Sequence, residues 1–524
     1  MPNRSTPARG HEFTPHRHLP FMTRARFALL AALSLSVGCS SVTPPTSVPT
    51  SSDASKVATV ATGPGGTTPA APAPARKPTL ALAVDPSNSG VLASKSTDVV
   101  VRVRLTGLET AAKQRPPVNL ALVVDTSGSM AGSPIERARE AGARLVDALQ
   151  VGDSLSIVTF GTQARTVVAA HTLDEKSKVR AKEEVAKIAA EGTTNMSAGL
   201  ELGLAELSRT HRPDGMSRVV LLGDGVPNDA APIPGIARRV AGLGATVTSL
   251  GLGLDFDETL MTQVAQLSGG RFHFIDDAAR VSAVFEKEVT QVKRVASRMA
   301  TVDFSPGPGV KILEVLGAGA GGFATTRVNV ADVIEGQTRE IFVKLRVDAK
   351  TSGSVELLDT NISYTDAGGQ ASFTAHEFET LRIVGKEQDL VETRKPEIQL
   401  EFVRLRVAQN LLDAIGRARG GDVAGARVLL DQTVKLSTEE SKRHGDADLA
   451  SKAEEARKLK KTIASLAPRP APFDPAMGTA VGSGTGLGLH PTKPSAAPAA
   501  LSADEALFVK RTHGSAQGAL QGDR

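Results

Sequence analysis

VNLALVVDTSGSM, residues 118–130, decides the fold class of this chain. Its first seven residues form a run of strand length that is apolar except for Asn119, which is typical of a strand buried on both faces. The polar Asp125 and a Gly-containing loop follow at once. From Pro134 to Gln150, apolar residues then recur at helical spacing along one face. This stretch therefore predicts a buried strand, a tight loop and an amphipathic helix.

The alternation of strand and helix continues to about residue 295. Further apolar runs predict strands at LSIVTFG, TVVAAH, RVVLLGD, ATVTSLGLG and RFHFI. Helical spacing separates them, at residues 174–190, 196–210, 230–243, 257–268 and 277–294. Apolar strands that alternate with helices form a largely parallel sheet covered on both faces. We therefore predict an α/β fold over residues 116–295, with a doubly wound, mostly parallel sheet that binds ligands at the carboxyl ends of its strands.

Strand-rich sequence lies on both sides of this α/β region. Residues 79–115 and 300–386 alternate β-branched and charged residues, as in DVVVRVRL and EIFVKLRVD, which indicates half-buried strands. We predict that 79–115 pairs with the β-sandwich domain at 300–386, so that the α/β region is inserted in the sandwich or flanked by it. Apolar residues at helical spacing then predict a helical region at 394–467.

Both ends of the chain differ from its middle in composition. Residues 1–38 hold five arginines against one acidic residue and end in the apolar run FALLAALSLSV, which are the parts of a secretory signal. Translation from Met22 would leave the same signal. Residues 39–78 are rich in Ser, Thr, Pro and Ala, and residues 468–524 are rich in Pro, Ala and Gly. We predict a disordered tether and a mostly disordered tail, with a short helix near Ser502–Arg511.

Cys39 is the single cysteine of the chain and lies just after the apolar run. One Cys excludes a disulfide scaffold and a Cys-based zinc site. The surrounding sequence resembles the lipobox of bacterial lipoproteins, although Ser36 stands where that family usually has Leu. The resemblance implies export and lipidation of Cys39, and Ser40 after it implies anchoring in the outer membrane. The alternative is an ordinary secretory signal with an incidental Cys.

Charge and motifs exclude several classes of function. The formal net charge of +5 arises mainly from the first 38 residues, so the remaining chain has no field that would attract nucleic acid. GAGAGG at 317–322 precedes a strand pattern, so no helix terminus is available there for a dinucleotide. No G-x-S-x-G motif surrounds Ser129. We expect no enzyme activity, no small-molecule substrate and no nucleic-acid partner.

Oxygen-bearing side chains follow several of the predicted strands. Asp125, Ser127 and Ser129 form an Asp-x-Ser-x-Ser loop, GTTN (192–195) precedes a helix, and Asp224 follows RVVLLG. The carboxyl ends of parallel strands meet at one edge of a sheet, so we expect these loops to lie together. Carboxylate and hydroxyl oxygens suit Mg²⁺, Mn²⁺ or Ca²⁺. The alternative is a loop kept as a turn, whose hydroxyls only cap the next helix.

DTSGSM, GTTN and LLGDGVPN, in this order and on these elements, resemble the von Willebrand factor A (VWA) domain and its metal-ion-dependent adhesion site. The resemblance assigns the metal ligands, position by position, to Asp125, Ser127, Ser129, Thr194 and Asp224. Thr193 is a weaker candidate for the threonine. The layout resembles bacterial lipoproteins with a central VWA domain, and it is also similar to inter-alpha-trypsin inhibitor heavy chains.

The resemblance implies a binding protein that needs a divalent cation, Mg²⁺ first, with Mn²⁺ or Ca²⁺ as alternatives. Two carboxylates and three hydroxyls leave such an ion coordinatively incomplete, so an Asp or Glu of a protein ligand can complete it. We therefore predict an envelope lipoprotein for adhesion or complex assembly, attached to the membrane through its N-terminal lipid. The alternative function is a passive structural or assembly component with an incidental or empty metal site. A third hypothesis, an enzyme subunit like the metal chelatases that carry this domain, is disfavoured by the export signal.

Overall fold

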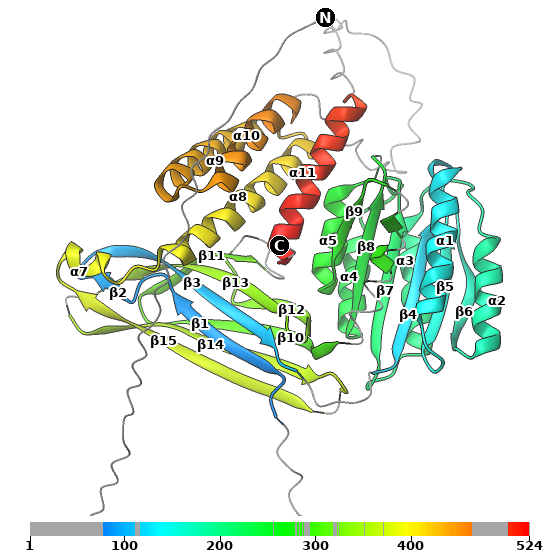
Figure 1. Cartoon of the computed structure of the whole chain (residues 1–524), viewed down its shortest axis with the longest axis horizontal. Coiled ribbons are helices and arrows are strands. Elements are labelled where there is room, and N and C mark those ends of the chain that lie inside the picture. The colour runs from blue at the N-terminus through cyan, green and yellow to red at the C-terminus, as the bar shows by residue number, and fades with distance from the viewer. Residues whose placement is uncertain are drawn as a thin grey trace, which may run out of the picture. The chain divides into compact units, whose positions relative to one another are not determined.

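The computed structural model describes residues 77–463 and 501–522, apart from 110–115, 255, 278–279, 282, 286, 288–293, 318–321, 323, 350–351 and 370. Three β-sheets and a group of helices make up this part of the chain (Figure 1). The predicted signal region, Cys39 and nearly all of the tether lie outside the described residues. Among the helices that are described, none is both long and apolar enough to cross a membrane.

The six-stranded sheet has the strand order β6-β5-β4-β7-β8-β9. The bounds of its strands are β4 (Val118–Asp125), β5 (Ser154–Phe160), β6 (Ala164–Thr172), β7 (Met216–Gly223), β8 (Ala245–Leu252) and β9 (Phe272–Ile275). All neighbours pair in parallel except the edge strand β6, which is antiparallel to β5. Every residue of β4, β5, β7 and β8 is buried, as expected for strands covered on both faces. The first strand of this sheet in sequence therefore lies in its interior.

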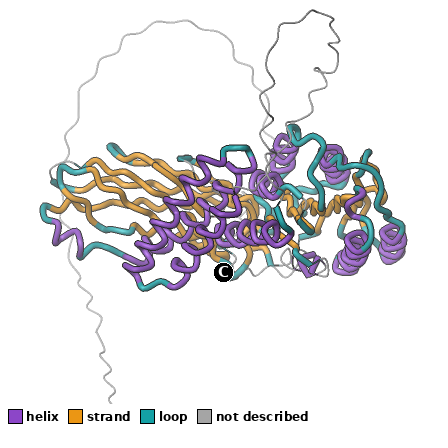
Figure 2. Tube along the Cα trace, turned by 90° about the horizontal axis from the view of Figure 1, so that it is seen from above, coloured by secondary structure: helices purple, strands orange, loops and turns teal. Residues whose placement is uncertain are grey.

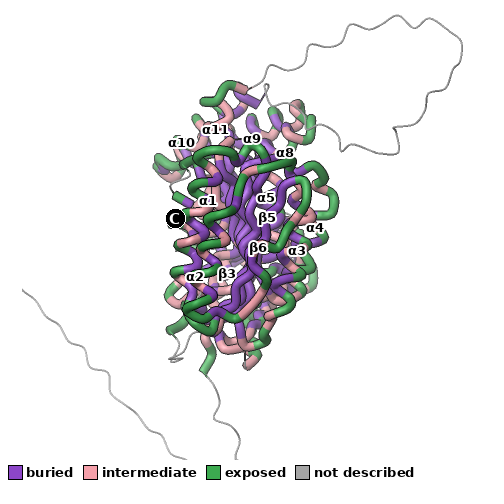
Figure 3. Tube along the Cα trace, turned by 90° about the vertical axis from the view of Figure 1, so that its right-hand side faces the viewer, coloured by how far each residue is buried: buried purple, intermediate pink, exposed green. Residues whose placement is uncertain are grey.

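Helices cover both faces of this sheet. Their bounds are α1 (Ser133–Ala148), α2 (Glu175–Ala186), α3 (Met196–Arg209), α4 (Ile233–Gly242) and α5 (Glu258–Ser268). Leu120 and Leu122 of β4 belong to an apolar core with α1 and α2, whereas Ala121 and Val123 belong to a second core with α3, α4 and α5. Figure 3 shows the buried strands between α1 and α2 on one side and α3 and α4 on the other. The predicted α/β fold class is confirmed.

The helix predicted at 277–294 is described only in part. Residues 281, 283–285 and 287 are helical. Val281 and Phe285 are buried in the core that contains α1 and α2, which places these residues on that face of the sheet.

Strands from both sides of the α/β region form the other two sheets. Their bounds are β1 (Leu80–Pro86), β2 (Gly90–Leu92), β3 (Ser96–Gly107), β10 (Val295–Pro306), β11 (Val310–Gly317), β12 (Arg327–Ile334), β13 (Thr338–Asp348), β14 (Ser354–Asp366) and β15 (Ser372–Val384). The strand orders are β1-β3-β13-β11 and β12-β10-β14-β15-β2. β3 pairs antiparallel with β13, and β2 pairs in parallel with β15. A shared apolar core, which includes Val101, Val302 and Val343, makes these sheets a β-sandwich into which the α/β unit is inserted.

A group of helices follows the sandwich in sequence. Its first members are α7 (Glu387–Val391), α8 (Pro396–Arg419), α9 (Val423–His444) and α10 (Ala447–Thr462). α8 packs against α9, and α9 packs against α10. Figure 2, seen from above, shows helices in front of the strands of the sandwich. Phe402 of α8 shares a buried core with Leu316 of β11 and Phe342 of β13. Helix α8 therefore rests on the four-stranded sheet, whereas α7 contacts β2 and β15 of the five-stranded sheet.

A further helix, α11 (Ala503–Gln521), lies in the predicted tail, at the place of the short helix predicted near Ser502–Arg511. It has 19 residues and so extends beyond that prediction. A capping box begins the helix, and a left-handed Gly522 ends it. Burial against α8 stabilises it, which the composition of the tail does not reveal. The apolar residues that it buries there are Val509, Ala516 and Leu520.

Candidate metal centre

Asp125 is the last residue of β4, at the carboxyl edge of the six-stranded sheet. The loop after it makes one 3-10 turn, η1 (Gly128–Met130), which the fully buried Met130 anchors. The Asp125 side chain is also fully buried. Its Oδ1 accepts a hydrogen bond of 2.8 Å from the Ser127 amide, whereas its Oδ2 has no hydrogen-bond partner among the described residues. A buried carboxylate oxygen without a partner costs free energy, so a positive charge beside it would be stabilising.

Two hydroxyl groups join this loop to Asp224. The Ser127 and Ser129 hydroxyls lie 3.1 Å apart, and Ser129 Oγ donates a hydrogen bond of 2.7 Å to Asp224 Oδ1. Asp224 directly follows β7, the parallel neighbour of β4. Ser127 and Asp224 are buried and Ser129 is exposed. The two loops therefore place two carboxylates and two hydroxyls together, with one side open to solvent.

Thr194 brings a third hydroxyl to the same place. It lies just before α3, whose first turn is capped by the Asn195 side chain, an acceptor for the Ala198 amide. A Cβ built on Gly225 would lie 2.8 Å from Thr194 Oγ1 and 3.6 Å from Asp125 Oδ2. Because both atoms flank one glycine, the missing side chain allows the threonine loop to approach the carboxylates.

Thr193 is oriented differently. Its hydroxyl accepts a hydrogen bond of 3.0 Å from the Asn228 side-chain amide, and the residue is exposed. Thr194 is buried, and its carbonyl accepts a 2.9 Å bond from the Asn228 amide. The structure therefore gathers the hydroxyl of Thr194, and not that of Thr193, with the other four predicted residues.

The electrostatics of the site favour a cation. Burial raises the pKa of Asp125 to about 6, and the Asp224 carboxylate adds to the increase, although hydrogen bonds from Ser127 oppose it. The described residues contain no group of three or more His, Cys, Asp or Glu side chains that could hold a metal, so the donors here are two carboxylates and three hydroxyls. All are hard oxygen donors, which suit Mg²⁺, Mn²⁺ or Ca²⁺. The residues present therefore fit the ion that the resemblance implies.

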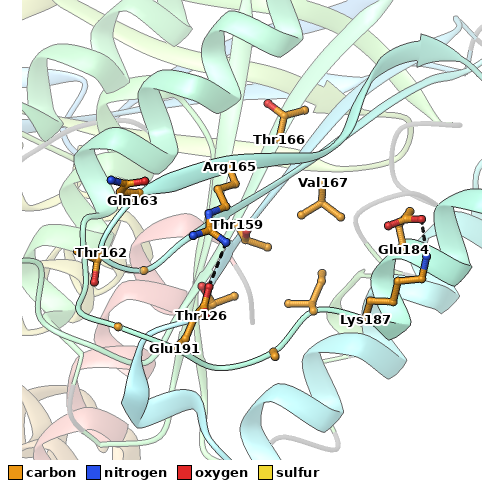
Figure 4. Close-up of a pocket in the computed structure, with 14 residues that line it drawn as sticks. Thr126, Thr159, Thr162, Gln163, Arg165, Thr166, Val167, Glu184, Lys187 and Glu191 are labelled. Carbon is orange, nitrogen blue, oxygen red and sulfur yellow. Dashed lines mark hydrogen bonds and ion pairs between the residues drawn. The ribbon is translucent and has the colours of Figure 1, made fainter.

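A polar cleft of about 730 Å³ opens beside these loops. It lies between β5, β6, the end of α2 and the loop before α3 (Figure 4). Arg165 pairs with Glu191 across 3.3 Å, and Lys187 pairs with Glu184 across 2.7 Å. Thr126, the neighbour of the metal loop, also lines it. The sequence does not predict this cleft, because its residues come from separate segments without a common motif.

Residues 119–287 match the family model of the von Willebrand factor type A domain. This range contains β5 to β9, nearly all of β4, and every loop of the candidate metal centre. The α/β unit is a VWA domain. VWA domains are commonly modules of protein interaction and adhesion and are generally not enzymes, so the match indicates the class of function.

Two solved structures share the fold over most of this chain. A von Willebrand factor type A protein from Catenulispora acidiphila is 17% identical with a TM-score of 0.59, and the match covers 83% of this chain and 96% of that protein. The ArnB paralogue VWA2 from Sulfolobus acidocaldarius is 16% identical with a TM-score of 0.52, and the match covers 85% of this chain and 100% of that protein. At these identities the similarity shows the fold alone.

Relatives found by sequence match smaller shares of the chain. An uncharacterised protein of Synechocystis is 26% identical over 349 residues, which are 62% of this chain and 79% of the relative. An uncharacterised protein of Escherichia coli is 25% identical over 215 residues, 40% of this chain and 37% of the relative. Human inter-alpha-trypsin inhibitor heavy chain H4 is 28% identical over 188 residues, 33% of this chain and 20% of the heavy chain. The last two matches thus cover much less than half of each relative.

Proposed function

We propose that this chain binds a partner protein through a divalent cation held by Asp125, Ser127, Ser129, Thr194 and Asp224. The observation that carries the proposal is the fully buried carboxylate of Asp125, whose Oδ2 makes no hydrogen bond among the described residues. If the loop served only as a turn, a neutral Asn would accept the same hydrogen bond from Ser127 without the cost of a buried charge. A carboxylate at this position is therefore better explained by a cation.

The donors favour Mg²⁺, with Mn²⁺ or Ca²⁺ as alternatives. The bound ion would supply a positive charge that attracts an Asp or Glu of the partner. Ser129 is exposed, so this side of the centre is accessible to such a carboxylate. The polar cleft beside the loops provides further hydrogen-bonding surface for the partner. The expected activity is binding, without covalent chemistry.

A second candidate function is a passive structural role in the cell envelope. The hydrogen bonds between Ser127 and Ser129 and between Ser129 and Asp224 favour it, because they satisfy these side chains without an ion. The two functions differ at Asp125 Oδ2, which this network leaves without a partner.

Peptide capture distinguishes the two functions. We would immobilise the chain and expose it to peptides that contain single Asp or Glu residues, beside matched peptides with Asn or Gln. Metal-dependent binding predicts capture of the acidic peptides in Mg²⁺, and its loss in EDTA or in Asp224→Ala. Asp98→Ala removes a carboxylate of the β-sandwich, 36% exposed, and should not change capture. Capture that survives both EDTA and Asp224→Ala, or no capture at all, would favour the passive role.

We further propose that the chain is exported and anchored in the outer membrane through a lipid on Cys39. The sequence supports this through its arginines, its apolar run and the position of its single Cys. In a host with an outer membrane, labelled palmitate should be incorporated into the wild-type chain and not into Cys39→Ser. Equal labelling of both chains, or of neither, would contradict lipidation at this residue.

A further inference from the structure

The C-terminal helix α11 contacts the VWA domain and the helical region at once. It packs against α8 and also against α5 and β9 (Figure 1). Lys510 of α11 is almost completely buried, and its ammonium group pairs with Glu258, the first residue of α5. Arg419 of α8 donates a hydrogen bond of 3.1 Å to the same carboxylate. One buried carboxylate therefore joins three helices that lie far apart in sequence.

A short series of contacts leads from Lys510 to the candidate metal centre. The ammonium group lies 3.9 Å from the centroid of the Phe256 ring and donates a hydrogen bond to the Phe256 carbonyl. This ring packs so closely on Gly251 that a Cβ there would have no room. Gly251 pairs with Gly223 between β8 and β7. A Cβ at Gly223 would lie 3.3 Å from Asp125 Oδ2. Through this series of contacts, α11 supports the ends of β7 and β8 next to the carboxylates of Asp125 and Asp224.

The buried face of α11 is unusually polar for a permanent part of a core. Beside three apolar side chains it buries Lys510, Thr512, His513 and Gln517. Polar atoms of this face that have no hydrogen-bond partner among the described residues are Thr512 Oγ1, His513 Nδ1 and Gln517 Oε1. Unsatisfied buried groups weaken an interface, and inter-domain contacts of this polar kind allow relative motion. Ser502 and Gly522, the residues next to α11 in sequence, cap its two ends. The helix therefore does not depend on other helices for its caps and can separate as a unit.

We propose that α11 is a releasable strap that supports the metal centre. When docked, it holds Phe256 against Gly251 and fixes the ends of β7 and β8; when released, it frees them. This proposal rests on the proposed metal-dependent function and adds its regulation. By linkage, docking of α11 and binding of the cation strengthen each other. The surface formed by α5, β9 and α8 is thus the docking site of residues 503–521 of this chain. Displacement of these residues from it weakens metal binding.

The test compares Lys510→Met with Lys458→Met in the full chain. Lys458 of α10 also contacts α11, 4.2 Å above the Phe508 ring, but the contacts that lead to Gly251 do not include it. Calorimetric titration with Mg²⁺ gives the dissociation constant, and hydrogen–deuterium exchange follows the amides of 251–258 and 503–521. We expect Lys510→Met to raise the Kd for Mg²⁺ about fivefold and to accelerate exchange in both segments. Lys458→Met should leave the Kd and the exchange of 251–258 unchanged.

The outcomes separate this inference from the proposed function. Equal Kd values for wild type and Lys510→Met, with exchange of 503–521 accelerated, would overturn the coupling. If Lys510→Met does not fold, the test uses hydrogen–deuterium exchange of the wild-type chain with and without Mg²⁺. Slower exchange of 503–521 in Mg²⁺ supports the strap, and unchanged exchange overturns it. Absence of Mg²⁺ binding by the wild-type chain is the failure of the proposed function. In that case accelerated exchange of 251–258 in folded Lys510→Met would still support the mechanical strap, and unchanged exchange would overturn it.

Discussion

Asp125 and Glu258 are two buried carboxylates at the same edge of the VWA sheet, and they differ in whether a positive charge lies beside them. Burial raises the pKa of Asp125 to about 6, the nearby Asp224 adds to this, and none of the main influences on it is a positive charge. Burial would also raise the pKa of Glu258, but the charges of Lys510 and Arg419 outweigh it and hold this pKa at about 2. Among the residues that the structure describes, positively charged side chains therefore compensate Glu258 and not Asp125.

This difference separates a carboxylate that holds the structure together from one that is suited to binding. Removing one partner of a buried ion pair is costly, because the other charge stays buried. A buried carboxylate without a cation instead destabilises the folded state until a ligand binds. Substitution at Glu258 and at Asp125 should therefore change stability in opposite directions.

The largest expected effect is that of Glu258→Gln. It leaves the buried ammonium of Lys510 without its carboxylate, and we expect the free energy of unfolding to fall by about 3–5 kcal/mol. Urea unfolding followed by circular dichroism measures the change. Glu201→Gln is the matched control, because it breaks an ion pair with Arg239 in which both side chains are about half exposed, and it should cost less than about 0.5 kcal/mol. Similar losses in both variants would contradict the role of Glu258.

The docking of α11 should weaken in mild acid through His513. Burial lowers the pKa of His513 from 6.5 to about 4; Glu258 opposes the shift, and Lys510 and Arg419 add to it. Because the folded-state pKa lies below the unfolded one, the stabilisation is complete above pH 6.5 and is lost as the pH falls from 6.5 to 4. We expect a loss on the order of 3 kcal/mol across this window.

Urea unfolding at pH 7, 5.5 and 4 measures this loss. Glu258 stays ionised throughout the window, because its pKa is about 2. His513→Gln removes the titrating group, so its stability should depend less on pH than that of wild type. Identical pH dependence in the two chains would show that His513 is not the cause.

The two threonines of GTTN should differ in their effect on metal binding. Thr194→Val removes the hydroxyl that lies with the carboxylates, and we expect Mg²⁺ affinity to fall about tenfold, the loss of one ligand interaction. Thr193→Val removes a hydroxyl bonded to Asn228 and should leave Mg²⁺ affinity unchanged. Calorimetry on both variants measures this. A larger loss in Thr193→Val would reassign the ligand.

Asp125→Asn should show the smallest effect and the opposite sign to Glu258→Gln. In the absence of metal, Asn keeps an acceptor for the Ser127 amide and removes a buried charge beside Asp224. We expect the metal-free chain to become more stable by about 1 kcal/mol. Urea unfolding in EDTA measures the change. A loss of stability of more than about 1 kcal/mol would mean that the Asp125 carboxylate has a structural role.

Features with a local signature could be predicted from the sequence, and contacts between distant polar residues could not. Apolar runs that end in DTSG and GDG place Asp125 and Asp224 after parallel strands. In the structure, hydrogen bonds of Ser127 and Ser129 link the two loops. Lys510 and Glu258 are 252 positions apart, and both residue types are rarely buried. Nothing local therefore marks this ion pair, and the sequence indicates α11 only in part, as the short helix predicted near Ser502–Arg511.

Calorimetric titration of the full chain with Mg²⁺, beside Asp125→Ala, decides whether the Asp125 carboxylate holds a cation. We expect saturable binding of one ion by the wild-type chain and no binding by Asp125→Ala, with unchanged circular dichroism. The absence of binding by the wild-type chain, or equal binding by the two chains, would contradict this expectation.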